Sequence, residues 1–371
     1  MVKILIAPDK FKGSLSAREV AENISAGLRD VLPDAKIDIV PMADGGEGTA
    51  QVIGDALGGS WVSCGAHDPL GRQINARYAW IEHRRLAVME MSEAAGMRRL
   101  SENERDPLST NTFGVGEILF DAVRRTADQI IIGLGGSATN DGGFGMARAL
   151  GFRFFSGNDH EYELNNAISE LQKLSRIQRP GNLLLPKIIA AVDVRNPLLG
   201  KNGATQIFGP QKGASEDKVD ILERALTRLA DVVSKDLEID YRDEPGAGAA
   251  GGLGFGLMSF CGARIRPGFD VVAEAVKLGA KMKDVDFVVT GEGSLDAQTL
   301  QGKTPAGVAQ LARRLGKRVF AIVGQAANDR PVREIFDEVY VLAQPRMSVK
   351  ENMAHAAELL RENAQELAKK L

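Results

Sequence analysis

Charged side chains follow several apolar runs of the chain, at the point where each run ends. The acidic ones are Asp9, Asp44, Asp193 and Asp296, and the basic ones are Lys10, Lys12, Lys212 and Lys303. Phosphoryl transfer needs carboxylates that hold a divalent cation, groups that position phosphates, and an acceptor for the proton of a substrate hydroxyl. These residue types at these positions therefore indicate chemistry on a phosphate.

Glycines accompany the charged residues in the same loops. The stretch IIIGLGGSATNDGG, residues 130–143, runs from branched apolar residues straight into glycine and small polar residues. Glycine lets backbone N–H groups approach an anion closely, and a following helix N-terminus adds a favourable dipole. The loops predict phosphate contacts from Gly135, Gly136, Ser137, Lys212, Glu292, Gly293, Ser294 and Lys303. As alternatives, a tight strand-to-helix turn also needs glycine, and Asn140 and Asp141 are residue types that cap helices.

Three near-matches to known glycine motifs need separate interpretation. Gly133, Gly135 and Ala138 fit the G-x-G-x-x-A fingerprint of dinucleotide-binding proteins, which expects an acidic residue about twenty positions further on; Asp159 lies near that distance. The glycines of PGAGAAGGLG (245–254) follow the polar segment YRDEP, so we interpret them as packing glycines. Gly302, Lys303 and Thr304 resemble the end of a P-loop, but its first glycine is missing.

The order of predicted elements indicates an α/β fold with two domains. Strand and helix patterns alternate at both ends of the chain, which is typical of parallel strands with helical crossovers. Residues 61–91 instead read as successive short strands, a β-meander. We therefore expect a discontinuous Rossmann-like parallel-sheet domain from residues 1–64 and 280–371. Residues 65–279 form an inserted α/β domain that contains the meander.

The composition is that of an ordinary globular protein. The chain has 371 residues, 44% of them hydrophobic and 26% charged, with a formal net charge of −3. This balance predicts no nucleic-acid or membrane-surface partner. Two cysteines make no disulfide framework, and the first apolar run is too short for a signal peptide, so we expect a cytoplasmic protein. Four scattered histidines argue against a zinc site or a serine triad.

Long segments in this order resemble the bacterial-type glycerate kinases. They are APDKFKGSLSA (7–17), PMADGGEGT (41–49), DPLSTNTFGVGE (106–117), IIIGLGGSATNDGG (130–143), DVRNPLLG (193–200), GATQIFGPQKGAS (203–215), PGAGAAGGLG (245–254) and TGEGSLDAQTLQGKTPAGVA (290–309). The resemblance implies ATP-dependent phosphorylation of glycerate to phosphoglycerate, with Mg²⁺, at an active site in the cleft between two α/β domains. Arg195 lies where such proteins more often carry a small polar residue.

At the matching positions, physical reasoning suggests a role for each residue. Asp193 ends an apolar run and is the first candidate for the central acid, with Asp44 as the second. Lys10 and Lys12 are candidates for the carboxylate of glycerate, and Asn140, Asp141 and Arg195 for further substrate contacts. The metal ligand stays open between Asp193 and Asp296. The position of the hydroxyl that is phosphorylated, the enantiomer and a homodimer also stay open.

Two other functions fit part of the same pattern. The first is an NAD-dependent dehydrogenase of a small hydroxy acid, which would use the fingerprint at Gly133. The second is a non-catalytic sensor of hydroxy acids, which would show a broken set of acidic residues and lysines. The set is intact in this sequence, which favours the kinase.

Overall fold

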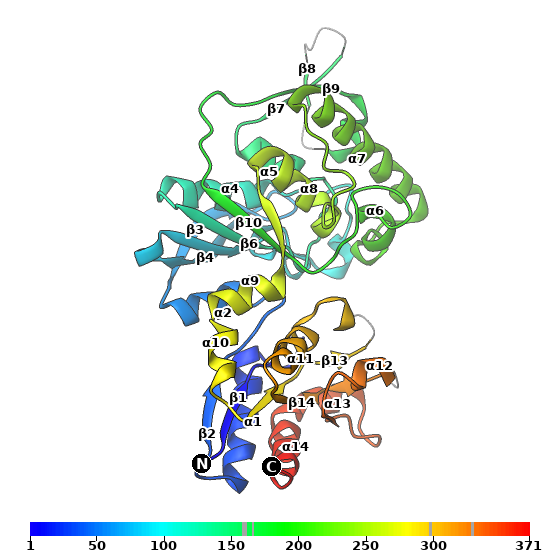
Figure 1. Cartoon of the computed structure of the whole chain (residues 1–371). Coiled ribbons are helices and arrows are strands. Elements are labelled where there is room, and N and C mark those ends of the chain that lie inside the picture. Colours follow the sequence, from blue (N-terminus) through cyan, green and yellow to red (C-terminus); the bar gives the residue numbers. More distant parts are fainter. Residues whose placement is uncertain (158–161, 165–166, 297–298, 328–329) are drawn as a thin grey trace. The chain divides into compact units, whose positions relative to one another are not determined.

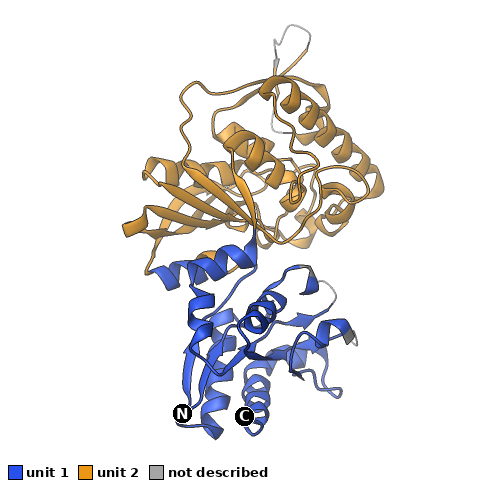
Figure 2. Cartoon of the chain, viewed as in Figure 1, with its two compact units in different colours: residues 1–44, 51–57, 267–371 blue, residues 45–50, 58–266 orange. Residues whose placement is uncertain are grey.

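The computed structural model describes residues 1–157, 162–164, 167–296, 299–327 and 330–371 (Figure 1). These residues form two compact units (Figure 2). Unit 1 consists of residues 1–44, 51–57 and 267–371, and unit 2 of residues 45–50 and 58–266.

The unit boundaries differ from the predicted positions near residues 64 and 280. Residue 64 lies inside β3 (Ser60–His67), which pairs along its whole length with β4 (Gln73–Ile81), so this strand stays in one sheet. At the other boundary, α9 (Gly268–Ala275) belongs to unit 1. Phe269 packs so closely on Gly307 of α11 (Thr304–Arg314) that a Cβ on this glycine would lie 2.5 Å from the ring.

Unit 1 contains a fully parallel five-stranded sheet in the order β16-β14-β12-β1-β2. Its strands are β1 (Lys3–Ile6), β2 (Lys36–Ile39), β12 (Phe287–Thr290), β14 (Arg318–Val323) and β16 (Glu338–Val341). Numbered in chain order the strands lie 2-1-3-4-5, so the direction of winding reverses between β1 and β12. Ligands of open α/β sheets bind beyond the carboxyl ends of the strands at such a reversal.

The strands of this sheet are apolar, so helices pack on the sheet and bury the strand side chains. Ile4 and Ile6 of β1 share a core with α1 (Ala17–Val31) and α14 (Ala356–Ala368), which lie side by side (Figure 1). Gly27 is needed there, because a Cβ would lie 2.2 Å from the carbonyl oxygen of Arg361. The remaining elements of the unit are α2 (Thr49–Leu57, shared with unit 2), α10 (Leu278–Lys283), β13 (Ser294–Leu295), β15 (Gln325–Ala326), α12 (Arg330–Arg333) and α13 (Val349–Ala354).

Unit 2 contains a six-stranded sheet in the order β11-β10-β6-β5-β4-β3. Here β5 (Leu86–Glu90), β6 (Gln129–Gly133) and β10 (Lys187–Val192) are parallel, whereas β3, β4 and β5 are joined antiparallel. The meander predicted for residues 61–91 is therefore confirmed, as is the α/β fold class. The other elements are α3 (Ser92–Ala95), α4 (Phe113–Arg124), α5 (Phe144–Ala149), β7 (Arg153–Ser156), β8 (Tyr162–Glu163), β9 (Leu174–Gln178), α6 (Ala204–Phe208), α7 (Glu216–Leu237), α8 (Ala249–Cys261) and β11 (Arg264–Pro267).

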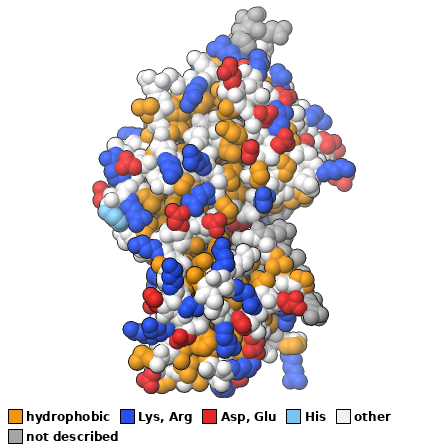
Figure 3. Space-filling model, viewed as in Figure 1, with side chains coloured by type: hydrophobic (Ala, Val, Ile, Leu, Met, Phe, Trp, Pro, Cys, Tyr) orange, Lys and Arg blue, Asp and Glu red, His pale blue; other side chains and the backbone are white. Residues whose placement is uncertain are grey.

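The surface carries charges of both signs. Lys and Arg side chains are interspersed with Asp and Glu over the face drawn in Figure 3, in keeping with the small net charge. In the described part of the chain, no helix has the length and apolar character needed to span a bilayer.

Candidate active site

In unit 1, the loops that follow β1 and β12 are bonded to each other where the sheet reverses direction. The backbone N–H of Asp9 donates to the carbonyl of Gly291 at 2.8 Å. The hydroxyl of Thr290 donates to the carbonyl of Ala7, also at 2.8 Å. These bonds place Asp9 and Glu292 in one neighbourhood, at the edge of the sheet where a ligand is expected.

Asp9 is the most strongly perturbed aspartate of this edge. It is 6% exposed, and its Oδ2 accepts a hydrogen bond from Thr304 Oγ1 at 2.7 Å. Burial, together with the nearby charge of Asp44, raises its pKa to about 6, although Lys10 opposes the shift. A carboxyl group that titrates near neutral pH is suited to hold a cation or accept a proton. The sequence placed Asp9 in a strand-end loop, but gave no reason to prefer it to the other aspartates.

Glu292 is buried beside the same group of carboxylates. Its Oε1 accepts a hydrogen bond from Thr299 Oγ1 at 2.6 Å. Burial raises the pKa of Glu292 to about 7, with contributions from the charges of Asp9 and Asp296, while Lys303 lowers it. A carboxylate does not bind a phosphate without a proton or a cation between them. The predicted phosphate contact of Glu292 is therefore better understood as an indirect one.

Lys303 immediately precedes helix α11, a position that suits the predicted phosphate role. It is the residue before the first helical turn, and its own side chain makes no capping hydrogen bond to that turn. We expect Lys303→Ala to weaken ATP binding about tenfold or more, the scale of one hydrogen bond to a charged group. Calorimetric titration with ATP alone measures the effect. Lys281→Ala, at an exposed position of α10, is the control, and equal ATP affinities in the two variants would contradict the role.

In unit 2, the ammonium group of Lys212 is buried beside the loop that follows β6. Lys212 is 2% exposed, and its Nζ donates to the carbonyl of Thr139 at 2.7 Å and to Ser137 Oγ at 3.3 Å. Burial lowers its pKa from 10.5 to about 7, and the charge of Asp141 opposes this shift. A buried cation bonded to a hydroxyl and a carbonyl can be stabilised by an anionic ligand, as the predicted phosphate role requires.

Asp141 and Asn140 differ in how far their polar atoms are used within the protein. Asp141 accepts hydrogen bonds from the backbone of Thr112, Gly143 and Gly145, so it holds the start of α5, as the capping alternative predicts. Burial raises the pKa of Asp141. Asn140 is fully buried and donates to Thr205 Oγ1 at 2.9 Å, while its Oδ1 has no hydrogen-bond partner among the described residues. An unsatisfied buried carbonyl is costly, which favours Asn140 over Asp141 as a ligand contact.

The glycines at the end of β6 and in the loop after it are required by packing or by backbone conformation. A Cβ on Gly133 would lie 2.4 Å from the carbonyl oxygen of Gly45, and one on Gly135 would lie 2.5 Å from Gly46 Cα. Gly136 has a φ of +71°, which disfavours any other residue. The next helix, α5, begins only at Phe144, so the strand–turn–helix context of a dinucleotide fingerprint is missing. Asp159, its expected acidic partner, lies outside the described residues.

The remaining predicted residues lie at the expected strand ends, with different exposures. Asp193 is half-buried and follows β10, whose residue Ala191 pairs with Gly133 of β6, so it shares an edge with Ser137. Lys10 Nζ lies 3.9 Å from Asp9 Oδ1. Lys12 and Arg195 are exposed, Asp44, Gly293 and Ser294 are partly buried, and Ser294 Oγ accepts from Gln325 Nε2 at 3.2 Å.

The described residues of the two units contain no preformed set of side chains that could bind a metal ion. No group of three or more His, Cys, Asp or Glu side chains in the described residues could hold a metal ion. Mg²⁺ is usually bound by only one or two carboxylates together with substrate phosphates and water. The buried carboxylates of Asp9 and Glu292 fit that pattern.

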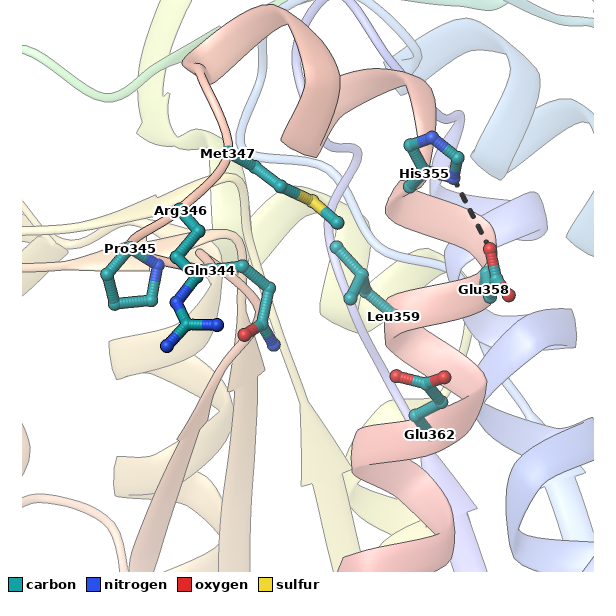
Figure 4. A pocket seen from close by; sticks show the side chains of 8 residues that line it. All are labelled: Gln344, Pro345, Arg346, Met347, His355, Glu358, Leu359 and Glu362. Carbon is teal, nitrogen blue, oxygen red and sulfur yellow. Dashed lines mark hydrogen bonds and ion pairs between the residues drawn. The ribbon is translucent and has the colours of Figure 1, made fainter.

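A cavity lies in unit 1 between the segment after β16 and helix α14, and none of the site residues described above lines it (Figure 4). It has a volume of about 620 Å³ and is lined by Gln344, Pro345, Arg346, Met347, His355, Glu358, Leu359 and Glu362. His355 Nδ1 lies 3.3 Å from Glu358 Oε2. The charged lining of the cavity consists of two carboxylates, Glu358 and Glu362, and one guanidinium, Arg346, so this cavity shows no preference for an anion.

Buried carboxylates at the carboxyl ends of parallel strands, and a buried lysine beside the loop after β6, fit an α/β enzyme of the phosphoryl-transfer class. Known proteins agree with this class. A family model described as the glycerate kinase family matches residues 4–371. A glycerate kinase of Halalkalibacterium halodurans is 40% identical over 371 residues, 99% of this chain and 98% of the relative.

Two further relatives extend the comparison. A protein named glycerate 2-kinase from Escherichia coli is 43% identical over 333 residues, 88% of this chain and 86% of the relative. A solved structure of a protein assigned as glycerate kinase 2, from Salmonella typhimurium LT2, matches with a TM-score of 0.87 at 41% identity and covers 100% of this chain and 98% of that one. The chain belongs to the glycerate kinase family.

This membership confirms the resemblance and the predicted enzyme class, a phosphotransferase with a hydroxyl group as acceptor. The kinase activity of the family implies ATP as the phosphoryl donor. Neither the dehydrogenase nor the sensor finds support among the relatives.

Proposed function

We propose that this chain transfers the γ-phosphoryl group of ATP to a hydroxyl group of glycerate. The hydroxyl oxygen forms a bond to the γ-phosphorus, the bond from that phosphorus to the bridging oxygen breaks, and ADP leaves. The hydroxyl proton passes to a carboxylate of the protein. The family membership of the chain supports this proposal. The main structural support is the buried ammonium group of Lys212 beside Ser137, because it can bind a phosphate as a cation.

Mg²⁺ is the proposed cofactor, and the residues that would hold it are Asp9 and Glu292. Asp296 lies in electrostatic range of Glu292, and Asp44 of Asp9, so either could support the ion. When bound, the ion would neutralise charge that develops on the phosphates. This assignment leaves Asp193 as the acceptor of the hydroxyl proton, with Asp44 as the second choice.

Lys10 and Lys12 are proposed to bind the carboxylate of glycerate. The helix dipole of α1 contributes little, because Ser16 and Glu19 already form a capping box at its N-terminus. The two ammonium groups must therefore supply most of the attraction. We expect Lys12→Met to raise the apparent KM for glycerate about tenfold, the scale of one hydrogen bond to a charged group, with ATP affinity unchanged.

Steady-state kinetics with each substrate varied measures this effect. Lys36→Met is the matched control, since Lys36 is exposed at the amino end of β2, the opposite edge of the same sheet. A fall in ATP affinity in Lys12→Met would assign this loop to phosphate instead.

The proposal requires groups from both units to act on one pair of substrates. Closure around the substrates would also exclude water that hydrolyses ATP. We expect glycerate together with a non-hydrolysable ATP analogue to reduce the radius of gyration, measured by small-angle X-ray scattering. An unchanged radius with both ligands bound would contradict closure.

A coupled assay of ADP release tests the activity itself. ADP should form only when Mg²⁺, ATP and glycerate are all present, and NAD in place of ATP should give no reaction. Release of ADP without glycerate, or none with it, would refute the proposal. The name of the Escherichia coli relative favours the 2-hydroxyl as acceptor, and phosphorus NMR of the product distinguishes 2-phosphoglycerate from 3-phosphoglycerate.

A cytoplasmic location is part of the proposal. It is supported by Cys64 and Cys261, which are both buried and form no disulfide, and by the need for cellular ATP.

A further inference from the structure

Unit 2 contains a cavity lined by arginines. None of the residues that line it belongs to the loops proposed to take part in the reaction. Its volume is about 330 Å³, within the range of small-molecule sites. The charged side chains that line it are Arg77, Arg98, Arg99 and Glu93. Ser63 and Asn75 add a hydroxyl and an amide.

The floor of this cavity is the exposed face of the β3–β4 pair. Ser63 is opposite Arg77, and Gly65 is opposite Asn75, so these residues share one face of the pleated strands. The intervening residue Ala76 faces the core. A Cβ on Gly65 would meet no atom within 4 Å, which shows that the space above this glycine is open.

The guanidinium groups of the rim are held in place by the protein. Arg98 Nη2 donates to Glu93 Oε1 at 2.5 Å and Arg99 Nη2 to Glu93 Oε2 at 3.3 Å. Arg98 Nε also donates to the carbonyl of Ser92 at 3.2 Å, and Arg99 Nε to that of Glu93 at 2.8 Å. The segment between them is tied down, because Met97 N donates to the carbonyl of Gly136 at 2.8 Å. Two of the three arginines are therefore ordered before any ligand binds.

The lining carries more positive than negative charge. Three guanidinium groups face one carboxylate, since Arg77 Nε lies 3.9 Å from Glu93 Oε1. Burial raises the pKa of the nearby Glu90, and the charge of Arg98 opposes this shift. Glu90 does not line the cavity, and its Oε1 accepts hydrogen bonds from the backbone N–H groups of Gly48 and Ala50, at 2.9 and 3.0 Å. The excess of two charges along the cavity wall matches a dianion.

We propose that this cavity binds a small phosphate-bearing anion, either inorganic phosphate or a phosphate monoester. The planar guanidinium fork pairs two N–H groups with two phosphate oxygens, and ordered arginines lose little entropy on binding. Ser63 and Asn75 supply further donors for the remaining oxygens. The site does not depend on the proposed function, because no residue assigned to phosphoryl transfer lines it.

Trp61 provides a reporter for binding. The guanidinium of Arg77 lies 4.4 Å from the centre of the Trp61 ring, and Trp61 is 40% exposed, whereas the other tryptophan, Trp80, is 5% exposed. Titration of the full-length protein with inorganic phosphate, at constant ionic strength, should give a saturable change in fluorescence. Trp61→Phe should lose the fluorescence change, while calorimetric titration of this variant should still detect phosphate binding. A parallel titration with glycerol 1-phosphate distinguishes the two sources, since the tighter of the two identifies the ligand.

Substitution of the arginines decides the proposal. Arg98→Gln and Arg77→Gln should each weaken binding at least tenfold, while Arg84→Gln, an exposed arginine of the same unit, leaves it unchanged. Arg77 lies on the rim with a side chain that is 56% exposed, so its variant is informative even where Arg98→Gln unfolds. Lys212→Met should keep this binding, which separates it from the proposed reaction site. A fluorescence change that does not saturate, or equal affinities in Arg77→Gln and Arg84→Gln, would overturn the proposal.

Discussion

Replacing Asp193 by asparagine is expected to lower kcat at least about a hundredfold, since the loss of a general base costs ~10²- to 10⁴-fold in rate. The asparagine amide would keep the shape of the aspartate side chain but could not accept the hydroxyl proton of the substrate. Asp193 is half-buried after β10, at the same sheet edge as the loop of Ser137. The proposed role of Asp193 as proton acceptor, and not a loss of folding stability, is the reason for the large expected effect.

Initial rates at saturating ATP and glycerate, over a range of Mg²⁺ concentrations, measure the effect. Loss of a general base lowers kcat at every Mg²⁺ concentration, whereas loss of a metal ligand also raises the Mg²⁺ concentration needed for activity. Asp220→Asn, at an exposed position of α7, is the matched control and should behave as the unmodified protein. The thermal midpoint should change little in either variant. Turnover of Asp193→Asn near that of the control would remove Asp193 from the reaction and make Asp44 the next candidate.

The second large effect is expected from Lys212→Met. Methionine keeps much of the length of the side chain but removes the cation that would meet a phosphate beside Ser137. Removal of a preorganised donor to a developing charge costs ~10²- to 10³-fold in kcat in other enzymes, and we expect a loss on this scale. Single-turnover phosphoryl transfer measures it, with Lys201→Met, an exposed lysine of the same unit, as control.

Lys212→Met is expected to lower kcat but to increase the stability of the folded protein at neutral pH. The pKa of Lys212 falls from 10.5 to about 7 on folding, so the unfolded chain binds more protons between these pH values. The contribution of Lys212 to stability therefore rises with pH across this window, and it is most unfavourable below about pH 7. Lys212→Met lacks this penalty. The free energy of unfolding of the unmodified protein, minus that of Lys212→Met, should rise between about pH 7 and 10.

Denaturant unfolding at several pH values tests the sign. Asp9 and Glu292 have raised pKa values, so their contributions to stability are lost as pH rises, but they are the same in both proteins and cancel in the difference. A difference that is flat with pH would show that Lys212 is not desolvated in the folded protein. An unchanged rate of phosphoryl transfer would separately remove it from the reaction.

Several elements could be predicted from the sequence because their signals are local. Apolar runs of β-branched residues predicted the strands of both sheets, and consecutive strand patterns predicted the meander. Ser16 and Glu19 are residue types that form a capping box, and they stand at the start of α1. From Val349 the C-terminal segment reads as one continuous amphipathic helix. The chain instead bends at His355, because α13 buries none of its residues whereas α14 packs on the core.

The sequence by itself determined the family, the parallel architecture and the set of charged residues at strand ends, because these depend on residue type and order. The tertiary structure alone decided which of those residues share an environment. Asp9 meets Thr304 from nearly three hundred residues away, and Lys212 is desolvated only because the fold closes over it beside Ser137 and Thr139. A pKa depends on such neighbours and on burial, and both arise from contacts between distant segments. For the same reason Gly135 is explained by Gly46, a residue that no local pattern connects to it.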